Sequence, residues 1–407
     1  MFNKTRADQK NLKIADESAS ESRKQVSGLR SLDSEYLDIR DSIPTGLKLV
    51  REYEEARERI LKVLRGTRED WDSYRWQLKN RVSDVEVLKG IIHLSENEIR
   101  EIEVTGRQYR WSVSPHYLSL MDPEDSNCPI RLQAIPSIKE YMGEPGLDYP
   151  MNVDKQLYPP LVARLYPDRL IIKLTNMCSM FCRHCQRKRD IDSRDVIHPM
   201  SRIQEAIDYV RENDEVRDVL LTGGDALVLS DDQLDYILTE LGNISHVEIK
   251  RLGSRMPCVM PQRITPELCE ILSKHDPVYL NTQFNHPREV TVEAQRAVDM
   301  LTRSGVVVRD QTVLLKRIND DPHVMKKLMQ ELLKIKVAPY YLFDCKKVDG
   351  IRHFGVPLDV GLNIIKKMRG FTSGMAVPTF IKHVPDARGK VPIYPRNQYG
   401  PVFEDTE

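Results

Sequence analysis

Short apolar runs alternate with amphipathic segments from Asp168 onward. In the amphipathic segments, apolar residues recur every three or four positions, which is typical of helices that cover a sheet. The apolar runs occupy residues 170–174, 219–221, 247–252, 278–284, 306–308 and 340–343, and a seventh follows at 376–381. Strands and helices repeating at this spacing predict a parallel sheet that forms a full or partial barrel, with a doubly wound open sheet as the alternative.

The amphipathic segments have recognisable ends. They cover residues 232–241, 265–274, 291–303 and 321–334, and a further helix is expected to begin at Ser201. Gln204 lies three residues after Ser201, the spacing of a capping box, in which both side chains bond to backbone N–H groups of the first turn. We therefore expect a helix between each pair of successive strands.

The first 110 residues have a different texture. Charged residues are denser there than in the whole chain, of which they make up 30%. Residues 52–65 form a charged amphipathic pattern that predicts a helix, and residues 70–94 continue in helical style. Residues 114–160 hold eight of the 24 prolines, which indicates a connector that wraps the body. We expect four regions: a helical N-terminal extension at 1–110, the connector at 111–167, the barrel at 168–375 and a short C-terminal segment at 376–407.

Composition excludes several classes of protein. The chain has 407 residues, 40% of them hydrophobic, which is enough for a large core. No apolar run approaches the roughly 18 residues of a membrane span, and the first ten residues lack the apolar region of a secretory signal. The 61 basic and 61 acidic side chains cancel, so net charge gives no reason to expect a nucleic-acid or membrane partner. We expect a cytoplasmic protein whose seven cysteines stay reduced.

Three of the cysteines form one motif. Cys178, Cys182 and Cys185 are spaced CxxxCxxC and directly follow the first predicted barrel strand, at the end where barrels place their active sites. Four-iron clusters usually have four cysteine ligands, so a three-cysteine loop leaves one iron free to bind another ligand. A structural zinc site completed by His184 or a distant residue is the alternative.

This motif resembles the signature of the radical S-adenosylmethionine (SAM) enzymes. In that superfamily the free iron chelates SAM, and the reduced cluster cleaves it to a 5′-deoxyadenosyl radical. The segment LTGGD ends the second predicted strand, where the superfamily has a GGE-like motif that contacts the amino group of SAM. The resemblance implies that Gly224 and Asp225 bind SAM, and a glycine pair lets the backbone approach a ligand closely.

A closer resemblance covers residues 109–390. The segments TNMCSMFCRHCQRKR, LTGGDAL, LGSRMPCVMPQRIT, NTQFNHP, DQTVLL and TSGMAVPTF are similar to those of the lysine 2,3-aminomutase family, in the same order. Enzymes of that family use a [4Fe-4S] cluster, SAM and pyridoxal 5′-phosphate (PLP) to move an α-amino group to the β-carbon. The resemblance implies an α/β fold, a partial (β/α)6 barrel of the TIM type, with an amino-acid substrate and a low-potential electron donor.

The family's functional positions fall on matching residue types. Lys390, in the segment DARGK, matches the lysine that binds PLP covalently. Arg169 and Tyr166, in the segment YPDR, and Gln311 match residues around PLP. Arg187 matches the arginine that binds the substrate α-carboxylate, a role that suits a bidentate guanidinium.

Two departures from the lysine enzymes concern the substrate side chain. In those enzymes two aspartates hold the ε-ammonium of lysine, and the aligned residues here are Lys346 and His383. A lysine that faces an ammonium in a closed pocket is unfavourable, whereas the same lysine attracts a carboxylate. The family's glutamate 2,3-aminomutases also have lysine at the first position. Lys347 is adjacent, so a shift of one residue in the alignment leaves the sign unchanged.

Further departures concern zinc and the cofactor sites. Lysine enzymes hold a structural zinc with four cysteines, three of them in a C-terminal tail, but here no cysteine follows Cys345 and Asp321 takes the fourth position. We therefore expect no zinc. Leu165 stands where the family has a second arginine, and Gln283 where the lysine enzymes have a histidine near SAM. The remaining cysteines are expected to pack in the core or line a pocket wall: Cys128, Cys258, Cys269 and Cys345.

Together these features predict a radical SAM, PLP-dependent 2,3-aminomutase, an isomerase that converts L-glutamate to β-glutamate. The resemblance implies that Arg187 binds the α-carboxylate, and that Lys346 and His383 bind the γ-carboxylate. A homodimer or higher homo-oligomer is expected, because the family is oligomeric. The alternatives are a lysine 2,3-aminomutase, an aminomutase for aspartate or a neutral amino acid, and a non-catalytic iron–sulfur or zinc protein.

Overall fold

The computed structural model describes residues 21–24, 26–141, 159, 161–191, 194–384 and 389–394. The chain divides into two compact units. The first, Met1–Ile43, contains helix α2 (Ser34–Ile39), and the second, Pro44–Glu407, contains every other element named below. Within the described residues, no helix combines the length and the apolarity needed to cross a membrane.

A group of helices precedes the sheet in the second unit. The longest are α3 (Val50–Leu64) and α7 (Glu96–Gln108), and both bury one apolar face. Shorter helices occupy the segment predicted to continue in helical style and the connector predicted after it, and capping side chains such as Thr67 and Ser73 fix the starts of several of them. These helices are α4 (Arg68–Asp72), α5 (Tyr74–Lys79), α6 (Val85–Lys89), α8 (Pro115–Ser119), α9 (Pro129–Ala134) and the 3-10 helix η1 (Ile138–Tyr141).

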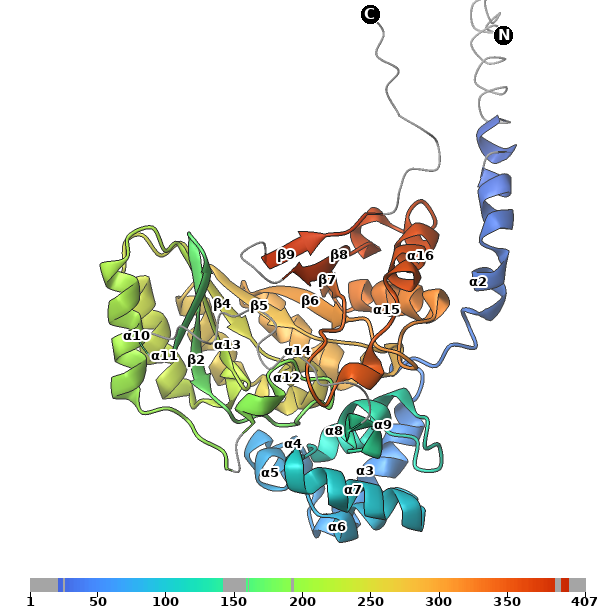
Figure 1. Ribbon diagram of the computed structural model, residues 1–407, viewed down its shortest axis with the longest axis horizontal. Coiled ribbons are helices and arrows are strands. Elements are labelled where there is room, and N and C mark those ends of the chain that lie inside the picture. Colours follow the sequence, from blue (N-terminus) through green and yellow to red (C-terminus); the bar gives the residue numbers. More distant parts are fainter. Residues whose placement is uncertain are drawn as a thin grey trace, which may run out of the picture. The chain divides into compact units, whose positions relative to one another are not determined.

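A nine-stranded sheet forms the body of this unit (Figure 1). Its strands lie side by side in chain order, and β2 to β8 run parallel. β1 and β9 pair antiparallel at the two edges. The strands are β1 (Val162–Tyr166), β2 (Arg169–Thr175), β3 (Asp218–Gly223), β4 (Ile249–Gly253), β5 (Val278–Thr282), β6 (Val307–Val313), β7 (Ala338–Phe343), β8 (Thr379–Val384) and β9 (Gly389–Pro392).

Helices connect the parallel strands, and each buries an apolar stripe. In α14, for example, Ala294, Ala297, Val298 and Leu301 recur at helical spacing and are buried. In Figure 1, α10 and α11 lie at one end of the sheet, and α15 and α16 at the other. The helices are α10 (Met200–Glu212), α11 (Asp231–Gly242), α12 (Met256–Val259), α13 (Pro266–Lys274), α14 (Val292–Arg303), α15 (Pro322–Lys334) and α16 (Leu358–Met368).

The sequential strand order confirms the predicted barrel-type fold. A doubly wound sheet would reverse its strand order, so that alternative is excluded. Two edge strands, β1 and β9, were not predicted. The capping box expected at Ser201 and Gln204 is wrong, because α10 begins directly after Pro199, whose fixed φ suits a helix start. The Gln204 amide donates to Asp208 instead (3.0 Å).

Alternation along the strands decides which side chains face the interior of the barrel. On β3, Val219 and Leu221 are fully buried in the main hydrophobic core, whereas Leu220 and Thr222 line a central cavity. Leu220 pairs in register with Arg251 of β4, which lines the same cavity. The two-residue period of the strands thus brings polar groups from neighbouring strands into one interior space.

Candidate active site

A cavity of about 660 Å³ lies inside the barrel. Its walls include parts of β2, β3 and β4 and the loops that follow them, the position at which barrels place active sites. The residues proposed from the sequence all line this cavity: Tyr166, Arg169, Cys178, Cys182, Cys185, Arg187, Gly224, Asp225, Gln283, Gln311, Lys346, His383 and Lys390. The fold therefore gathers residues that are up to 224 positions apart, as Tyr166 and Lys390 are.

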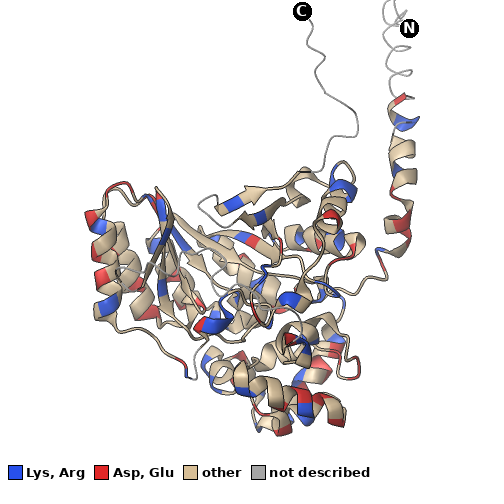
Figure 2. Ribbon diagram, viewed as in Figure 1, with Lys and Arg blue, Asp and Glu red and all other residues tan. Residues whose placement is uncertain are grey.

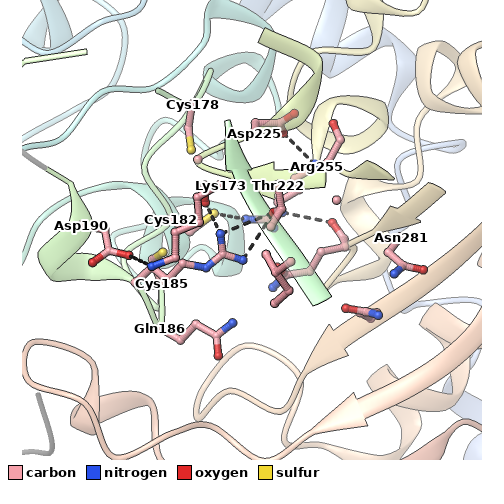
Figure 3. Close-up of a pocket in the computed structure, with 18 of the residues that line it drawn as sticks. Lys173, Cys178, Cys182, Cys185, Gln186, Asp190, Thr222, Asp225, Arg255 and Asn281 are labelled. Carbon is pink, nitrogen blue, oxygen red and sulfur yellow. Dashed lines mark hydrogen bonds and ion pairs between the residues drawn. The ribbon is translucent and has the colours of Figure 1, made fainter. Parts of the chain in front are cut away.

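The three motif cysteines lie in the loop after β2 and line the cavity near the end of β3 (Figure 3). Burial raises the pKa of the Cys178 and Cys185 thiols, and the neighbouring thiol groups raise it further. Buried thiols of this kind ionise when a metal cation binds them. Among the described residues, no three His, Cys, Asp or Glu side chains could hold a single metal ion. In a four-iron cluster each cysteine binds a different iron, so these three thiols fit that group.

The glycine pair at the end of β3 packs against the start of the cysteine loop. The Gly224 N–H donates to the Thr175 carbonyl (2.5 Å), and the Asp225 N–H donates to the Met177 carbonyl (2.9 Å). A Cβ at Gly224 would overlap the backbone of Met177, and Gly223 has a φ of +119°, which strongly favours glycine. The pair therefore allows two loop backbones to meet and holds the cysteine loop in place.

Asp225 is buried beside this loop. Its two carboxylate oxygens accept hydrogen bonds from the backbone N–H groups of Leu227 (3.0 Å) and Arg255 (2.8 Å). Burial raises the pKa of the carboxyl, while these hydrogen bonds and one from Ser254 oppose that shift. The structure shows Asp225 as a loop anchor, and its contact with SAM stays a prediction.

Arg187 reaches from the cysteine loop to the end of β3. Its guanidinium donates to the Gly223 carbonyl and lies 3.4 Å from the hydroxyl of Thr222, which is labelled in Figure 3. Both partners belong to the cavity wall. A cation is thus fixed at the carboxyl end of β3, beside the three cysteines.

Lys390 lies on the edge strand β9. Its backbone N–H donates to the Tyr166 hydroxyl on β1 (2.9 Å), so a side chain links the two edge strands of the sheet. Its ammonium lies 4.8 and 5.1 Å from the centroids of two aromatic rings of β7. Burial, together with the positive charges of Arg251 and Arg169, lowers the pKa of Lys390 to about 8. The amine is therefore neutral far more often than that of an ordinary lysine, as a nucleophile requires.

Two arginines supply the charges that act on Lys390. The Arg169 guanidinium stacks on the Tyr166 ring, 3.8 Å from its centroid, and its buried Nε has no hydrogen-bond partner in the described structure. Arg251 donates to Asp218 (2.6 Å) and was not recognised from the sequence. Cations outnumber carboxylates in this part of the wall, which fits an anionic group such as a phosphate.

The two residues predicted to set the substrate lie beside β7 and on β8. Lys346 lines the cavity, whereas its neighbour Lys347 is exposed and lies outside the cavity wall. His383 stacks on Phe343, with 5.6 Å between ring centroids. Burial, with the charges of Lys346 and Lys390, lowers the pKa of His383 to about 3, so its ring is neutral at physiological pH. Lys346 is therefore the cation at this position, and His383 is a neutral hydrogen-bonding group.

Gln283 and Gln311 line the cavity on neighbouring strands and loops. The Gln283 amide nitrogen lies 3.0 Å from His184 Nε2 and 3.3 Å from Asn285 Oδ1. Burial and the charge of Arg255 lower the pKa of His184 well below its ordinary value. These contacts tie the loop after β5 to the cysteine loop, and a contact of Gln283 with SAM stays a prediction.

Several buried polar atoms on the cavity wall lack hydrogen-bond partners in the described structure. They are Arg169 Nε, Ser179 Oγ, His184 Nδ1, Asn281 Nδ2, Thr282 Oγ1 and His383 Nδ1. Buried polar atoms are nearly always paired, because an unpaired one costs free energy. Their number around the cavity fits a site that binds polar small molecules.

Two buried charged groups next to the cysteines were not recognised from the sequence. Arg255 donates to Cys182 Sγ (2.9 Å), and Glu140 forms ion pairs with Arg183 and Lys188 of the cysteine loop. The partners are far apart in the chain, so no local pattern marks them. They hold the cysteine loop against the helices that precede the sheet.

A sequential parallel barrel with CxxxCxxC after its first parallel strand defines the class of radical SAM proteins. A sequence profile of the Radical SAM superfamily matches residues 172–328. Among relatives, the glutamate 2,3-aminomutase of Clostridioides difficile is 49% identical over 368 residues, which are 90% of this chain and 87% of the relative.

Two other relatives are named L-lysine 2,3-aminomutase. That of Fusobacterium nucleatum is 47% identical over 331 residues, 81% of this chain and 78% of the relative. That of Clostridium subterminale is 47% identical over 327 residues, 80% of this chain and 79% of the relative. The chain belongs to the lysine 2,3-aminomutase family of radical SAM isomerases.

Proposed function

We propose that this protein moves the α-amino group of L-glutamate to the β-carbon and releases β-glutamate. The observation that carries the proposal is the position of Lys346 on the cavity wall. The resemblance places an aspartate of the lysine enzymes at this position. A cationic wall favours a substrate with a second carboxylate over one with a second ammonium.

Other groups near Lys346 support this preference. His383 is neutral and can donate a ring N–H to a carboxylate. Asp344 also lines the cavity, but burial raises its pKa, and the adjacent charge of Lys382 opposes that shift and offsets its charge. This part of the wall therefore stays attractive to an anion.

The cavity also fits the cofactors of the family. We infer that Cys178, Cys182 and Cys185 hold a [4Fe-4S] cluster, and that Lys390 binds PLP while Arg169 pairs with its phosphate. When bound, these groups and SAM supply a 5′-deoxyadenosyl radical and stabilise the unpaired electron while the amino group migrates. The thiols, the lowered pKa of Lys390 and the unpaired Arg169 Nε support this assignment.

The chain itself orients the substrate and excludes water. Arg187 binds the α-carboxylate, while Lys346 and His383 bind the γ-carboxylate, so that the substrate is held at both ends. Fixing both carboxylates places the α- and β-carbons at one position between them. The surrounding barrel excludes water from that position.

A lysine 2,3-aminomutase is the second candidate, because two relatives with 47% identity carry that name. A lysine substrate would place its ε-ammonium near Lys346, where the two positive charges repel. A non-catalytic iron–sulfur or zinc protein needs no PLP on Lys390, so a PLP adduct there distinguishes it from an enzyme.

Turnover by the reconstituted protein tests the proposal. Anaerobic protein with reduced cluster, SAM and PLP is incubated separately with glutamate, aspartate and lysine, and the β-amino acid products are identified by mass spectrometry. We expect β-glutamate, and turnover of lysine alone would overturn the substrate assignment. Borohydride reduction followed by peptide mass analysis should place PLP on Lys390, and a product without that adduct would overturn the cofactor assignment.

We also propose a cytoplasmic homodimer or higher homo-oligomer that receives its electron from a low-potential donor. The resemblance to an oligomeric family supports the first point, and the low potential that SAM cleavage demands supports the second. Light scattering on the purified holoenzyme should give at least twice the mass of the 47.2 kDa chain, and a monomeric mass would contradict the assembly.

A further inference from the structure

We infer that Arg255 is a positioning residue that raises the reduction potential of the iron–sulfur cluster through a hydrogen bond to Cys182. The guanidinium donates to Cys182 Sγ at 2.9 Å (Figure 3). Arg255 follows β4 and lies 73 residues from its sulfur partner. The inference rests on the proposed cluster at this cysteine and concerns an arginine that the sequence motifs leave without a role.

Several partners hold the rest of Arg255. Its backbone N–H donates to Asp225 (2.8 Å), and its Nε donates to the Gln283 carbonyl (3.1 Å). Its second amino group donates to Glu289 (2.8 Å) and to the side-chain carbonyl of Gln133 (2.7 Å). Only 8% of Arg255 is exposed. A side chain held by so many bonds has little freedom to turn away from the sulfur.

Glu289 completes this arrangement. One of its carboxylate oxygens accepts from the Tyr117 hydroxyl (2.6 Å) and the Gln133 amide (2.9 Å). The other accepts from the backbone N–H groups of Asn285 and His286, the second at 3.0 Å. Tyr117 and Gln133 belong to helices that precede the sheet, so these helices support the surroundings of the cysteine loop.

The direction of the effect follows from charge. Reduction adds one negative charge to the cluster, so a donor aimed at a ligand sulfur stabilises the reduced form and raises the potential. Glu289 balances the charge of Arg255, and both are buried. The short hydrogen bond to the Cys182 sulfur is therefore the main interaction that stabilises the reduced cluster more than the oxidised cluster.

The midpoint potential of the reconstituted cluster tests the inference without substrate or PLP. In Arg255→Met/Glu289→Gln, the hydrogen bond is lost while the pair of charges is removed together. We expect the equilibrium constant for one-electron reduction to fall about tenfold, a shift of about 59 mV to more negative potential. Arg255→Lys keeps the cation and loses the planar fork, so we expect a smaller shift in the same direction.

Arg81→Met/Asp195→Asn is the matched control, because it also removes a pair of opposite charges together. Arg81 also touches the cysteine loop, but its guanidinium donates to the Cys178 carbonyl and to Asp195 rather than to a sulfur. We expect the cluster of this control to keep the midpoint potential of the unaltered protein. An equal shift in the control and in Arg255→Met/Glu289→Gln would overturn the assignment of the effect to the hydrogen bond at the sulfur.

Iron and sulfide content separate the remaining outcomes. A double variant with a full cluster and an unchanged potential would contradict the role of Arg255. If the double variant assembles no cluster, an unchanged potential in Arg255→Lys contradicts it equally. Unaltered protein that assembles no four-iron cluster would overturn the proposed function instead.

Discussion

Lys346 allows the substrate assignment to be tested by a single change of charge. Lys346→Met removes the cation with little change in length, and Lys346→Asp restores the residue type that the resemblance gives the lysine enzymes. Lys347→Asp is the matched control, because Lys347 is adjacent in sequence but exposed and outside the cavity wall. If the wall charge at Lys346 selects the substrate, only the first two variants alter selectivity.

The expected magnitude follows from the position of Lys346. Two charges at about 4 Å interact by about 4 kcal/mol at an effective dielectric constant of about 20. Lys346 is only partly buried, so solvent screens part of this energy, and a hydrogen bond to a charged group contributes about 1.5–3 kcal/mol. We expect Lys346→Met to lower kcat/KM for glutamate by about 10- to 100-fold. Lys346→Asp adds repulsion and should lower it by about 1,000-fold or more.

The assay measures β-glutamate formation by the anaerobic holoenzyme over a range of glutamate concentrations. Because the charge binds the ground state and the transition state alike, Lys346→Met should act mainly on KM. Equal PLP and iron content across the variants shows that the site remains assembled. If Lys346→Asp keeps the glutamate kcat/KM of the unaltered protein, the charge of Lys346 does not select the substrate. An equal loss in Lys347→Asp would lead to the same conclusion.

Three further predictions concern the fold and the PLP lysine. Because the pKa of Lys390 is about 8 rather than 10.5, the neutral amine accumulates as pH rises through 8. The rate of PLP capture, followed by absorbance, should therefore level off above pH 8, and a rate that keeps rising to pH 10 would contradict this. Tyr166→Phe removes the acceptor of the Lys390 backbone N–H and should destabilise the link between β1 and β9 by about 1 kcal/mol. Hydrogen exchange of the β9 amides should become faster, and unchanged exchange would count against the link. Glu140→Gln leaves two buried cations without their carboxylate and should lower the free energy of unfolding by about 3–5 kcal/mol in denaturant titrations. Glu96→Gln, on an exposed helix turn, is the control and should change the free energy of unfolding by less than about 0.5 kcal/mol.

Most of the parallel strands and four of the connecting helices were predictable because each of these carries its own local signal. Apolar runs mark β2 to β7, and the helical periodicity between them places α11, α13, α14 and α15 to within a residue or two. The cysteine motif was equally visible, because its spacing is local. These features depend on neighbours in the sequence, and a single chain displays them directly.

The edge strands could not be predicted in the same way. β9 has only four residues, begins with a glycine and ends with a proline, so neither length nor alternation marks it. Its position depends on pairing with β8 and on the Tyr166 hydroxyl, 224 residues before Lys390. The predicted start of α10 was wrong because Pro199 precedes the first helical residue, Met200, which lies one residue before the predicted capping serine.

The site was predictable only where a family motif marks a residue. Gly224 and Asp225 were assigned to SAM, yet their visible contacts hold the cysteine loop and the Arg255 backbone. Arg255 lies in the segment LGSRMPCVMPQRIT, but its role could not be predicted, because its side-chain partners Cys182, Gln133 and Glu289 come from three separate parts of the chain. Burial and long-range hydrogen bonds appear only after folding.

Competition between substrates in one vessel tests whether glutamate is the preferred substrate. The anaerobic holoenzyme receives equimolar isotopically labelled glutamate, aspartate and lysine in one vessel, and the β-amino acids are quantified by mass spectrometry at low conversion, which gives the ratio of kcat/KM values. A selectivity of about 3 kcal/mol at Lys346 predicts β-glutamate in excess over β-lysine by at least about 100-fold. An excess of β-lysine would contradict the assignment of glutamate as the substrate.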